Sequence, residues 1–287
     1  MPRYAYHLLN VFSQTTLGGN ALCVFEDGRG LDDATMLALA RQFNLSETTF
    51  LLPSNVADAR VRIFTPGYEM PFAGHPTLGS ANVVRNLRGG QNSLQLEFKA
   101  GIVPVSAQAD VWTLTAPTPN GVVATAPKES PDLICAMLGL QLDDLASQPL
   151  WINTGADQLL IPLNSVEAVR RAQPASHLLA QWPISSLERK TAYVFAFDRA
   201  AGPNQVVARY FFTMQGGGVA EDPATGSACA NLGGWLLHSG HALPLDLVVR
   251  QGDQVERPSH LHLHVSQAQA IQVSGRVVEL GGGYIDL

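Results

Sequence analysis

The sequence predicts an α+β protein built from two related halves. Apolar runs of strand length alternate with segments of helical spacing, which argues against an all-β barrel or a helical bundle. Two passages, each a strand that leads through a polar turn into a helix of small residues, resemble one another. The chain has 287 residues, enough for two medium domains or one large one with a sizeable core.

The repeat starts at two arginines. Arg62 lies in a strand that leads to the helix beginning near Gly74, and Arg209 lies in a strand that leads to the helix beginning near Gly226. The second passage is longer, and residues 215–219 can absorb the difference. Related halves usually pack about a pseudo-twofold axis, so we expect both helices to begin at one pocket in the crevice between the halves. Chance similarity in a Gly- and Ala-rich chain is the alternative.

In the first half, the apolar pattern predicts strands and two helices. Asp32 can cap a helix that runs through Asn44, with its apolar side chains on one face. Pro76 suits the first turn of the second helix, whose small residues let other elements approach closely. The expected strands are residues 4–12, 21–25, 45–52, 59–65, 94–105 and 111–114.

The second half repeats this order after a Pro- and Thr-rich segment, residues 117–131, which is the best candidate for a linker. Residues 155–161 also weakly echo residues 19–25. The halves are therefore predicted as residues 1–118 and 119–287, and the final strand can return to pack on the N-terminal half. Helices are expected over 132–138, 165–172 and near 176, strands over 151–163, 191–198, 205–213, 245–251, 261–266, 271–274, 277–280 and 284–287, and a turn at 281–283.

Composition excludes several classes of protein. A net charge of −6 argues against a nucleic-acid or anionic-membrane surface, because both need clustered Lys and Arg. Three widely spaced cysteines without a CxxC pair argue against disulfides or a zinc site and for a reducing compartment. No apolar h-region and no membrane-length apolar run are visible, so a cytoplasmic protein is expected.

The loop at residues 221–228 is the most suggestive stretch. It carries Glu221 and Asp222, then a Pro- and Gly-containing turn, and runs into a segment of small and apolar residues. A helix N-terminus offers free N–H donors and partial positive charge, so this loop can deliver polar groups to an anion site. A plain helix cap is the simpler reading of the same residues.

Several motifs together carry a resemblance. Five motifs occur in one specific order along the chain. They are residues 12–20, residues 44–50 (Asn-Leu-Ser-Glu-Thr-Thr-Phe), residues 62–79 with Ala-Gly-His-Pro, residues 221–228, and the Gln-Gly and Arg-Pro-Ser of residues 251–259. In that combination the chain resembles the PhzF-like family of phenazine biosynthesis over essentially its whole length. The resemblance implies the diaminopimelate epimerase-like fold, in which two pseudo-symmetric halves are each a mixed β-sheet or barrel around a central helix, with the active site in the cleft between them.

The resemblance also implies a cofactor-independent isomerase without a metal. Glu47 matches the family's acid/base carboxylate, and His75 and Asp222 are expected beside it as catalytic residues. Gly74, Gly226 and Ser227 are expected to bind the substrate. The chemistry is coherent, because a carboxylate in a closed, partly apolar cleft has a raised pKa suited to taking a proton and returning it to another carbon.

Each of these residues also has a structural interpretation. Glu47 alone would pass as a solvated loop carboxylate, and His75 as a first-turn residue bonded to backbone. Asp222 could be a local cap ahead of Pro223, and the hydroxyl of Ser227 could satisfy backbone donors.

Other features are weaker signals. The epimerase branch of the fold uses two opposed thiols, but the corresponding turns here lack cysteine, and Cys229 is expected to be a buried small residue. His260, His262 and His264 share one strand face, yet they diverge along it, so a half-exposed strand is expected rather than zinc. The glycines at 216–218 lack a following Gly-Lys-Ser/Thr, so they are not a phosphate loop.

The sequence therefore predicts an isomerase that moves a proton on a small carboxylate-bearing metabolite, with trans-2,3-dihydro-3-hydroxyanthranilate as the leading substrate. The alternatives are another isomerase or epimerase of this family with a different substrate, and a non-catalytic small-molecule binding protein. A small-molecule partner and a homodimer are expected, the latter only from the resemblance.

Overall fold

The computed structural model describes residues 1–118, 121–214 and 217–287. The chain forms two compact units, one of Met1–Thr115 with Ser274–Leu287 and the other of Ala116–Val273. The sequence predicts halves of residues 1–118 and 119–287, with a final strand that can return to pack on the N-terminal half, and Ser274–Leu287 lie in the first unit. Parts of the expected linker and of the expected insertion, residues 119–120 and 215–216, lie outside the described residues.

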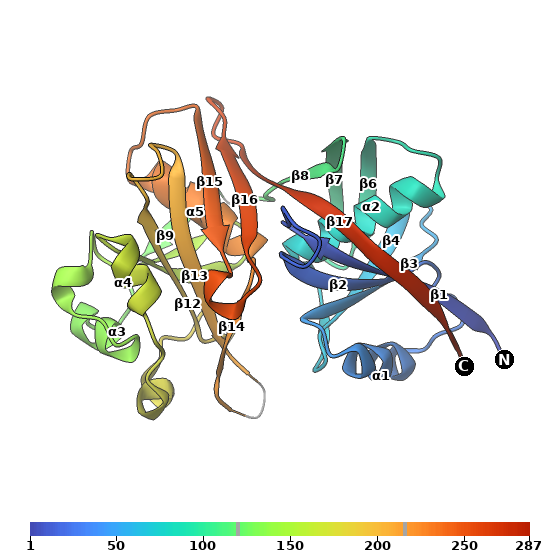
Figure 1. Cartoon of the computed structure of the whole chain (residues 1–287), viewed down its shortest axis with the longest axis horizontal. Helices are drawn as coiled ribbons and strands as arrows, with labels where there is room; N and C mark the ends of the chain where they lie inside the picture. Colours follow the sequence, from blue (N-terminus) through green and yellow to red (C-terminus); the bar gives the residue numbers. More distant parts are fainter. Residues whose placement is uncertain (119–120, 215–216) are drawn as a thin grey trace. The chain divides into compact units, whose positions relative to one another are not determined.

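The strands of the first unit close into a barrel around one helix, α2 (Gly74–Leu87), as Figure 1 shows. Neighbouring strands pair in the order β1, β2, β3, β4, β6, β7, β8, and β17 closes the barrel by pairing with both β8 and β1. The strands are β1 (Arg3–Val11), β2 (Asn20–Phe25), β3 (Glu47–Leu52), β4 (Ala59–Phe64), β5 (Glu69–Met70), β6 (Ser93–Phe98), β7 (Gly101–Gln108), β8 (Val111–Thr115) and β17 (Ile271–Asp286).

Helix α2 fits inside the barrel because its residues are small. Every residue from Gly74 to Val84 is buried. A Cβ at Gly79 would lie only 2.4 Å from a methyl carbon of Leu22 on β2, so glycine permits this close approach. Helix α1 (Asp33–Phe43) packs outside the barrel, and Asp32 caps it by accepting a hydrogen bond from the N–H of Thr35, as predicted.

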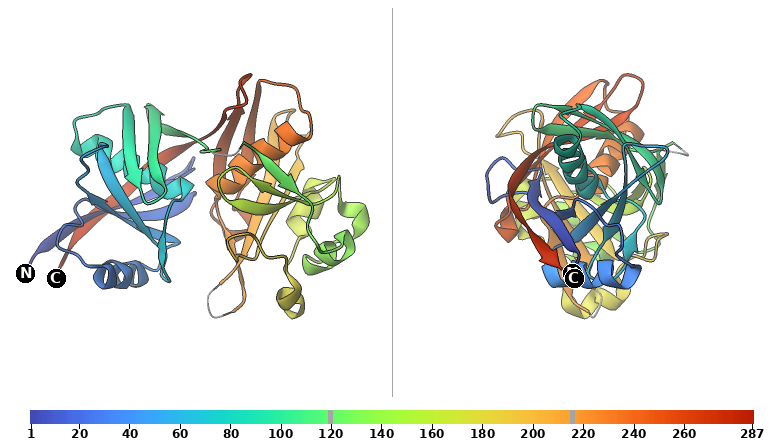
Figure 2. Two further views of the ribbon diagram at one scale, coloured as in Figure 1. Left: turned by 180° about the vertical axis from the view of Figure 1, so that it is seen from behind. Right: turned by 90° about the vertical axis from the view of Figure 1, so that its right-hand side faces the viewer.

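The second unit repeats the order of the first. In the second unit, β11 and β12 are parallel, β12 and β13 are antiparallel, and β13 pairs antiparallel with β14 and parallel with β15. The first unit has the same pairings in the same directions, with β2, β3, β4, β5 and β6 in the places of β11, β12, β13, β14 and β15. The internal repeat is therefore confirmed, with α5 in the place of α2 (Figures 1 and 2). The elements are β9 (Val123–Thr125), α3 (Pro131–Met137), η1 (Leu142–Asp144), β10 (Leu150–Asn153), β11 (Asp157–Pro162), α4 (Val166–Arg171), η2 (Ser176–Gln181), β12 (Thr191–Phe197), β13 (Gln205–Thr213), β14 (Val219–Asp222), α5 (Gly226–His238), β15 (Leu245–Gln251), η3 (Asp253–Val255) and β16 (Ser259–Val265).

The two arginines that begin the repeat make equivalent contacts. Arg62 pairs with Glu69 across the β4–β5 hairpin at 2.7 Å, and its guanidinium lies 5.0 Å from the ring centre of Phe64. Arg209 pairs with Glu221 across the β13–β14 hairpin at 2.7 Å, with its guanidinium 4.7 Å from the ring centre of Phe211. Each hairpin thus carries the same ion pair beside the loop that leads to its central helix.

The end of the chain differs from the prediction. Residues 281–283 were expected to form a turn between two strands, but β17 runs through them without a break. Tyr6 pairs with Gly283 and His7 with Gly282, and a Cβ at Gly282 would lie 2.3 Å from the carbonyl oxygen of Tyr6. The glycines therefore allow close pairing with β1, which brings the two termini side by side (Figure 1).

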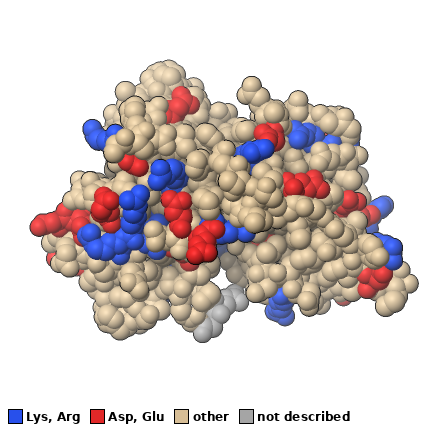
Figure 3. All heavy atoms as spheres, viewed as in Figure 1, with Lys and Arg blue, Asp and Glu red and all other residues tan. Residues whose placement is uncertain are grey.

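The surface does not carry one dominant charge on the face drawn in Figure 3, where acidic and basic side chains are interspersed. Among the residues that the structure describes, the helices are too short or too polar to span a lipid bilayer.

Candidate active site

Glu47 is the first residue of β3, on the strand face that looks toward the central helix. Side chains alternate along a strand, so Glu47 and Thr49 lie on one face. The hydroxyl of Thr49 lies 3.0 Å from that of Ser80 in α2, which identifies this face as the inner one. Phe50, on the opposite face, stacks on Phe25 with ring centres 4.9 Å apart in the cluster beneath α1. Alternation thus aims the Glu47 carboxylate into the barrel.

The first turn of α2 supplies the next two residues. Gly74 and His75 begin the helix, and the N-cap residue Ala73 makes no side-chain capping hydrogen bond. The first turn contains no acidic residue. The N–H groups at this end therefore have no helical acceptor, and the helix dipole leaves partial positive charge there. This arrangement can hold an oxyanion.

Glu47 and His75 lie side by side. Nε2 of His75 is 3.3 Å from Oε2 of Glu47, with 7% of the His75 side chain and 14% of the Glu47 side chain exposed. Burial lowers the pKa of His75 to about 3, although a hydrogen bond to the backbone of Ala21 acts in the opposite direction. His75 is therefore neutral near pH 7, and the contact is not an ion pair of the usual kind.

The hydrogen bond with Ala21 determines which ring nitrogen of His75 carries the proton. Nε2 makes no hydrogen bond of good geometry within the described residues, so the bond to Ala21 uses Nδ1. A bond that favours the charged ring is one in which the ring N–H donates to the Ala21 carbonyl. The neutral ring then has its lone pair on Nε2, directed at the Glu47 carboxyl group.

The corresponding helix of the second unit begins in the same way. Gly226 and Ser227 are its first residues, Thr225 makes no side-chain capping bond to the helix, and the first turn contains no acidic residue. Both central helices thus start with glycine and leave their first N–H groups uncapped. The predicted substrate-binding glycines occupy equivalent places in the two units.

Asp222 ends β14 just before this helix and belongs to a polar cluster. Oδ2 of Asp222 accepts a hydrogen bond of 2.5 Å from the hydroxyl of Thr225. The side-chain amide of Gln251 donates to the Asp222 carbonyl at 2.8 Å and to the Thr225 hydroxyl at 3.0 Å. The cluster fixes the Asp222 carboxylate against the loop, and sequence reasoning assigned no role to Thr225 or Gln251.

Ser227 is tied to a second set of residues that the sequence did not single out. The side-chain amide of Gln158 on β11 donates to the Ser227 hydroxyl at 2.9 Å, and Gln158 is itself bonded to Asn231 of α5 at 2.9 Å. A polar Asn231 within a helix of small apolar residues was the available signal, because a fully buried amide needs partners.

The cysteines and the strand histidines do not form a site. Cys23, Cys135 and Cys229 are buried and free. Burial raises the pKa of the Cys229 thiol far above its usual value, which disfavours a thiolate. Nδ1 of His264 on β16 lies 2.7 Å from Oδ1 of Asp246 on the neighbouring strand β15. Within residues 1–118, 121–214 and 217–287, no group of three His, Cys, Asp or Glu side chains could hold a metal ion.

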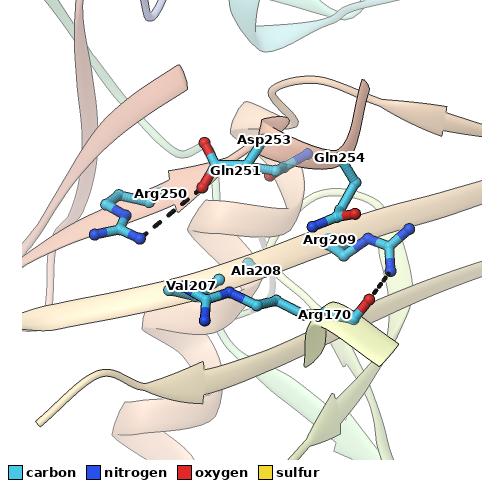
Figure 4. A pocket seen from close by; sticks show the side chains of 8 residues that line it. All are labelled: Arg170, Val207, Ala208, Arg209, Arg250, Gln251, Asp253 and Gln254. Atoms are coloured by element: carbon cyan, nitrogen blue, oxygen red, sulfur yellow. Dashed lines mark hydrogen bonds and ion pairs between the residues drawn. The ribbon is translucent and has the colours of Figure 1, made fainter. Parts of the chain in front are cut away.

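Each unit also has a cavity at the place where two strands share one edge of a third. In the first unit β5 and β6 both pair with β4, and in the second unit β14 and β15 both pair with β13. The first, of about 200 Å³, is lined by Arg60, Arg62 and Lys99 among others. The second, of about 40 Å³, lies beside Arg209 and Arg250 (Figure 4). Figure 4 shows Arg209 donating to the Arg170 carbonyl and Arg250 facing Asp253, with distances of 3.0 and 3.9 Å. These cationic grooves are repeats of one another and lie apart from Glu47 and His75 in sequence and strand position.

Comparison with known proteins gives the family. The model of the phenazine biosynthesis-like (PhzC-PhzF) proteins matches residues 9–283, so the chain belongs to this family. An uncharacterized isomerase of Pasteurella multocida is 40% identical over 98% of this chain and 93% of its own. A trans-2,3-dihydro-3-hydroxyanthranilate isomerase of Pseudomonas fluorescens is 30% identical over 98% and 99% of the two chains.

The solved structures agree on the fold. A PhzF-family protein from Bacillus anthracis superposes with a TM-score of 0.84 over 100% of both chains, at 21% sequence identity. The predicted fold class, two pseudo-symmetric halves of the diaminopimelate epimerase-like kind, is confirmed.

Proposed function

We propose that this isomerase moves a proton within a small carboxylate-bearing metabolite, without a cofactor, and that Glu47 is the group that carries the proton. The observation behind the proposal is the contact between Glu47 and a neutral His75, with 3.3 Å between Oε2 and Nε2. A carboxyl group beside a buried lone pair can exist in both protonation states, which is what a group that takes and returns a proton requires.

The reaction has two proton transfers. In the first, a carbon–hydrogen bond of the substrate breaks, the proton passes to the Glu47 carboxylate, and the electron pair moves into the conjugated system. In the second, the Glu47 carboxyl group, whose O–H exchanges with water between the two steps, gives a proton to a different carbon, and the electron pair returns. Between the two steps, Nε2 of His75 accepts a hydrogen bond from the protonated carboxyl group and stabilises it. His75 does not give up a proton itself at neutral pH, because Nδ1–H is bound to Ala21.

The start of α2 supports the charge that develops. The free N–H groups at Gly74 and the positive end of the helix lie next to His75, in the same turn. An enolate-like intermediate gains most from such donors because its negative charge is largest between the two transfers. Gly74 is proposed to act here through its backbone alone.

Asp222, Gly226 and Ser227 are proposed as the residues of the second unit that contact the substrate. Their support is the equivalence of the two helix starts and the fixed orientation of Asp222 by Thr225. The leading substrate is trans-2,3-dihydro-3-hydroxyanthranilate, because the relative from Pseudomonas fluorescens is named for it. A homodimer and a cytoplasmic location stay predictions, and sedimentation of the purified protein tests the first.

The experiment incubates trans-2,3-dihydro-3-hydroxyanthranilate with the enzyme in heavy water. Wild type should form product with solvent deuterium at the carbon that receives the proton, and Glu47→Gln should do neither while still binding the substrate. Glu97→Gln is the matched control: it makes the same change at a carboxylate of β6 that bonds to Ser54, and it should behave as wild type.

Other outcomes separate the alternatives. Turnover by Glu47→Gln at the wild-type rate contradicts the role of Glu47. Binding without turnover or deuterium exchange by wild type indicates a binding protein for this compound. No binding at all directs the search to other carboxylate-bearing substrates.

A further inference from the structure

A chain of buried amide side chains leads to Ser227 in the second unit. Asn231 is fully buried and Gln158 is 6% exposed, so neither amide can rely on water for its hydrogen bonds. Asn231 bonds to Gln158 at 2.9 Å, and Gln158 bonds to Ser227 at 2.9 Å. Each amide has a donor end and an acceptor end, so the orientation of the chain decides what Ser227 can offer.

The orientation of Asn231 is fixed by two backbone groups. Its Oδ1 accepts from the backbone N–H of Thr154 at 2.9 Å, and its Nδ2 donates to the carbonyl of Ala156 at 2.8 Å. A backbone N–H can only donate, and a carbonyl can only accept. Rotating the amide by half a turn would place donor against donor and acceptor against acceptor, so this orientation is the stable one.

That orientation passes through Gln158 to Ser227. Nδ2 of Asn231 faces Oε1 of Gln158, so the Gln158 oxygen is the accepting end. Its Nε2 therefore points the other way, and donates to the hydroxyl oxygens of Ser227 at 2.9 Å and Tyr210 at 3.5 Å. With a lone pair of Ser227 held by this N–H, the Ser227 proton is directed at some other acceptor.

We infer that Gln158, oriented by Asn231, is a positioning residue that makes Ser227 a hydrogen-bond donor to an oxygen acceptor of the bound ligand, such as a carboxylate. This inference rests on the proposed function in one respect, the contact of Ser227 with the substrate. A donor here matches the start of α5, where Gly226 and its neighbours present N–H groups and partial positive charge. Side chain and backbone then offer the ligand the same polarity.

The first unit shows that the fold itself does not need this chain. The strand register and the helix starts align Leu22 with Gln158, and Gly79 with Asn231. Leu22 and Gly79 also touch each other, but the contact is apolar: a Cβ at Gly79 would lie 2.4 Å from Leu22. At these equivalent positions the first unit thus has an apolar contact and the second unit has two buried amides. Because packing alone is met by the apolar contact, the amides of the second unit point to a functional role.

The kinetic test is a double-mutant cycle with trans-2,3-dihydro-3-hydroxyanthranilate as substrate. Ser227→Ala removes the donor and should raise KM about tenfold, the scale for a hydrogen bond to a charged group, with less effect on kcat. Gln158→Met, which imitates the apolar place of Leu22, should raise KM about threefold to fivefold. In the Ser227→Ala background, Gln158→Met should add almost nothing, because the two residues act through one bond.

Equal effects of Gln158→Met in both backgrounds would overturn the inference, since they would show that Gln158 acts without Ser227. Urea unfolding of each variant separates a loss of stability from a loss of binding. An unchanged KM in Ser227→Ala would contradict the contact between Ser227 and the substrate. It would therefore contradict the substrate-binding role proposed for Ser227.

A second measurement does not depend on any substrate. Neutron diffraction from crystals of deuterated protein should show both deuterons of the Gln158 amide on the side of Ser227 and Tyr210, and the Ser227 deuteron pointing away from Gln158. A Ser227 deuteron directed at a Gln158 oxygen would refute the orientation even if the enzyme isomerises the substrate as proposed.

Discussion

Glu47 and Thr191 occupy equivalent places in the two units. Ile63 and Tyr210 directly follow the arginines that begin the repeat, and they pair with Thr49 and Tyr193 respectively. Two residues earlier on those strands lie Glu47 and Thr191, each at the start of its strand. The fold is therefore repeated, but a carboxyl group stands at this place in the first unit and a hydroxyl in the second. That difference is consistent with the proposal that a single carboxyl group, Glu47, carries the proton.

This asymmetry predicts different responses to matched substitutions. Glu47→Asp withdraws the carboxyl group by about one carbon–carbon bond, and a displacement of about 1 Å commonly costs about 100-fold in rate. We expect kcat to fall by about that factor with a smaller change in KM. Thr191→Val at the equivalent place should leave kcat within about threefold. Steady-state kinetics of the two variants checks both, and an equal loss would contradict the one-sided assignment.

The neutral state of His75 predicts an acid-sensitive stability. Burial lowers its pKa to about 3 in the folded protein, against about 6.5 in the unfolded chain. The unfolded chain therefore binds more protons between these values, so the stability is complete above about pH 6.5 and falls as the pH drops toward 3. Between pH 6.5 and 4.5 the loss from this group is about 2 to 3 kcal/mol.

Urea unfolding at those two pH values measures the effect. His75→Asn removes the titrating ring, so the variant should lose less stability than wild type on acidification by that amount. His262→Asn, at an exposed place on β16, is the control and should follow wild type. A His75→Asn variant whose stability falls in parallel with wild type would mean that His75 is charged in the folded protein near pH 5.

The sequence indicates the fold better than it indicates the polar contacts. Glu47 and His75 lie far apart in the chain, and only the motif resemblance pairs them; the structure adds that β3 and the start of α2 put them in contact. Gln158 and Asn231 were missed because, read locally, they are one polar residue in an apolar strand and one in a helix of small residues. Their meaning depends on a packing of β11 against α5 that no local pattern encodes.

The two hairpin ion pairs should differ in their contribution to stability. The Glu221 side chain is 7% exposed, and Arg209 also donates to backbone carbonyls at the end of α4. Glu221→Gln leaves that guanidinium without its counter-charge, and we expect a loss of about 3 kcal/mol in the free energy of unfolding. Glu69→Gln should cost only about 1 kcal/mol, because Arg62 keeps Asp33 at 2.8 Å.

Urea unfolding of both variants, followed by tryptophan fluorescence, compares the two losses. Trp112 lies in the first unit, and Trp151, Trp182 and Trp235 lie in the second. Replacing Trp112 with Phe in both variants restricts the signal to the second unit, where the loss from Glu221→Gln should appear. A larger loss from Glu69→Gln than from Glu221→Gln would show that burial of the carboxylate is not what decides these contributions.

Gly252 should be the most demanding glycine beside the Asp222 cluster. Its φ is +85°, and a Cβ there would lie 2.3 Å from the Arg257 carbonyl oxygen and 2.6 Å from that of Pro223. Both neighbours are backbone atoms, so Gly252→Ala must displace the loop that follows Asp222, at a cost above about 3 kcal/mol.

Gly240 provides the matched control. It also has a positive φ, +72°, but a Cβ would meet nothing within 4 Å, so Gly240→Ala should cost only the strain of the left-handed conformation, about 1 kcal/mol. Thermal unfolding compares the two variants. Where Gly252→Ala remains folded, we expect a raised KM for trans-2,3-dihydro-3-hydroxyanthranilate, because moving Pro223 also moves the adjoining Asp222. An unchanged KM together with a large loss of stability would separate this loop from the substrate.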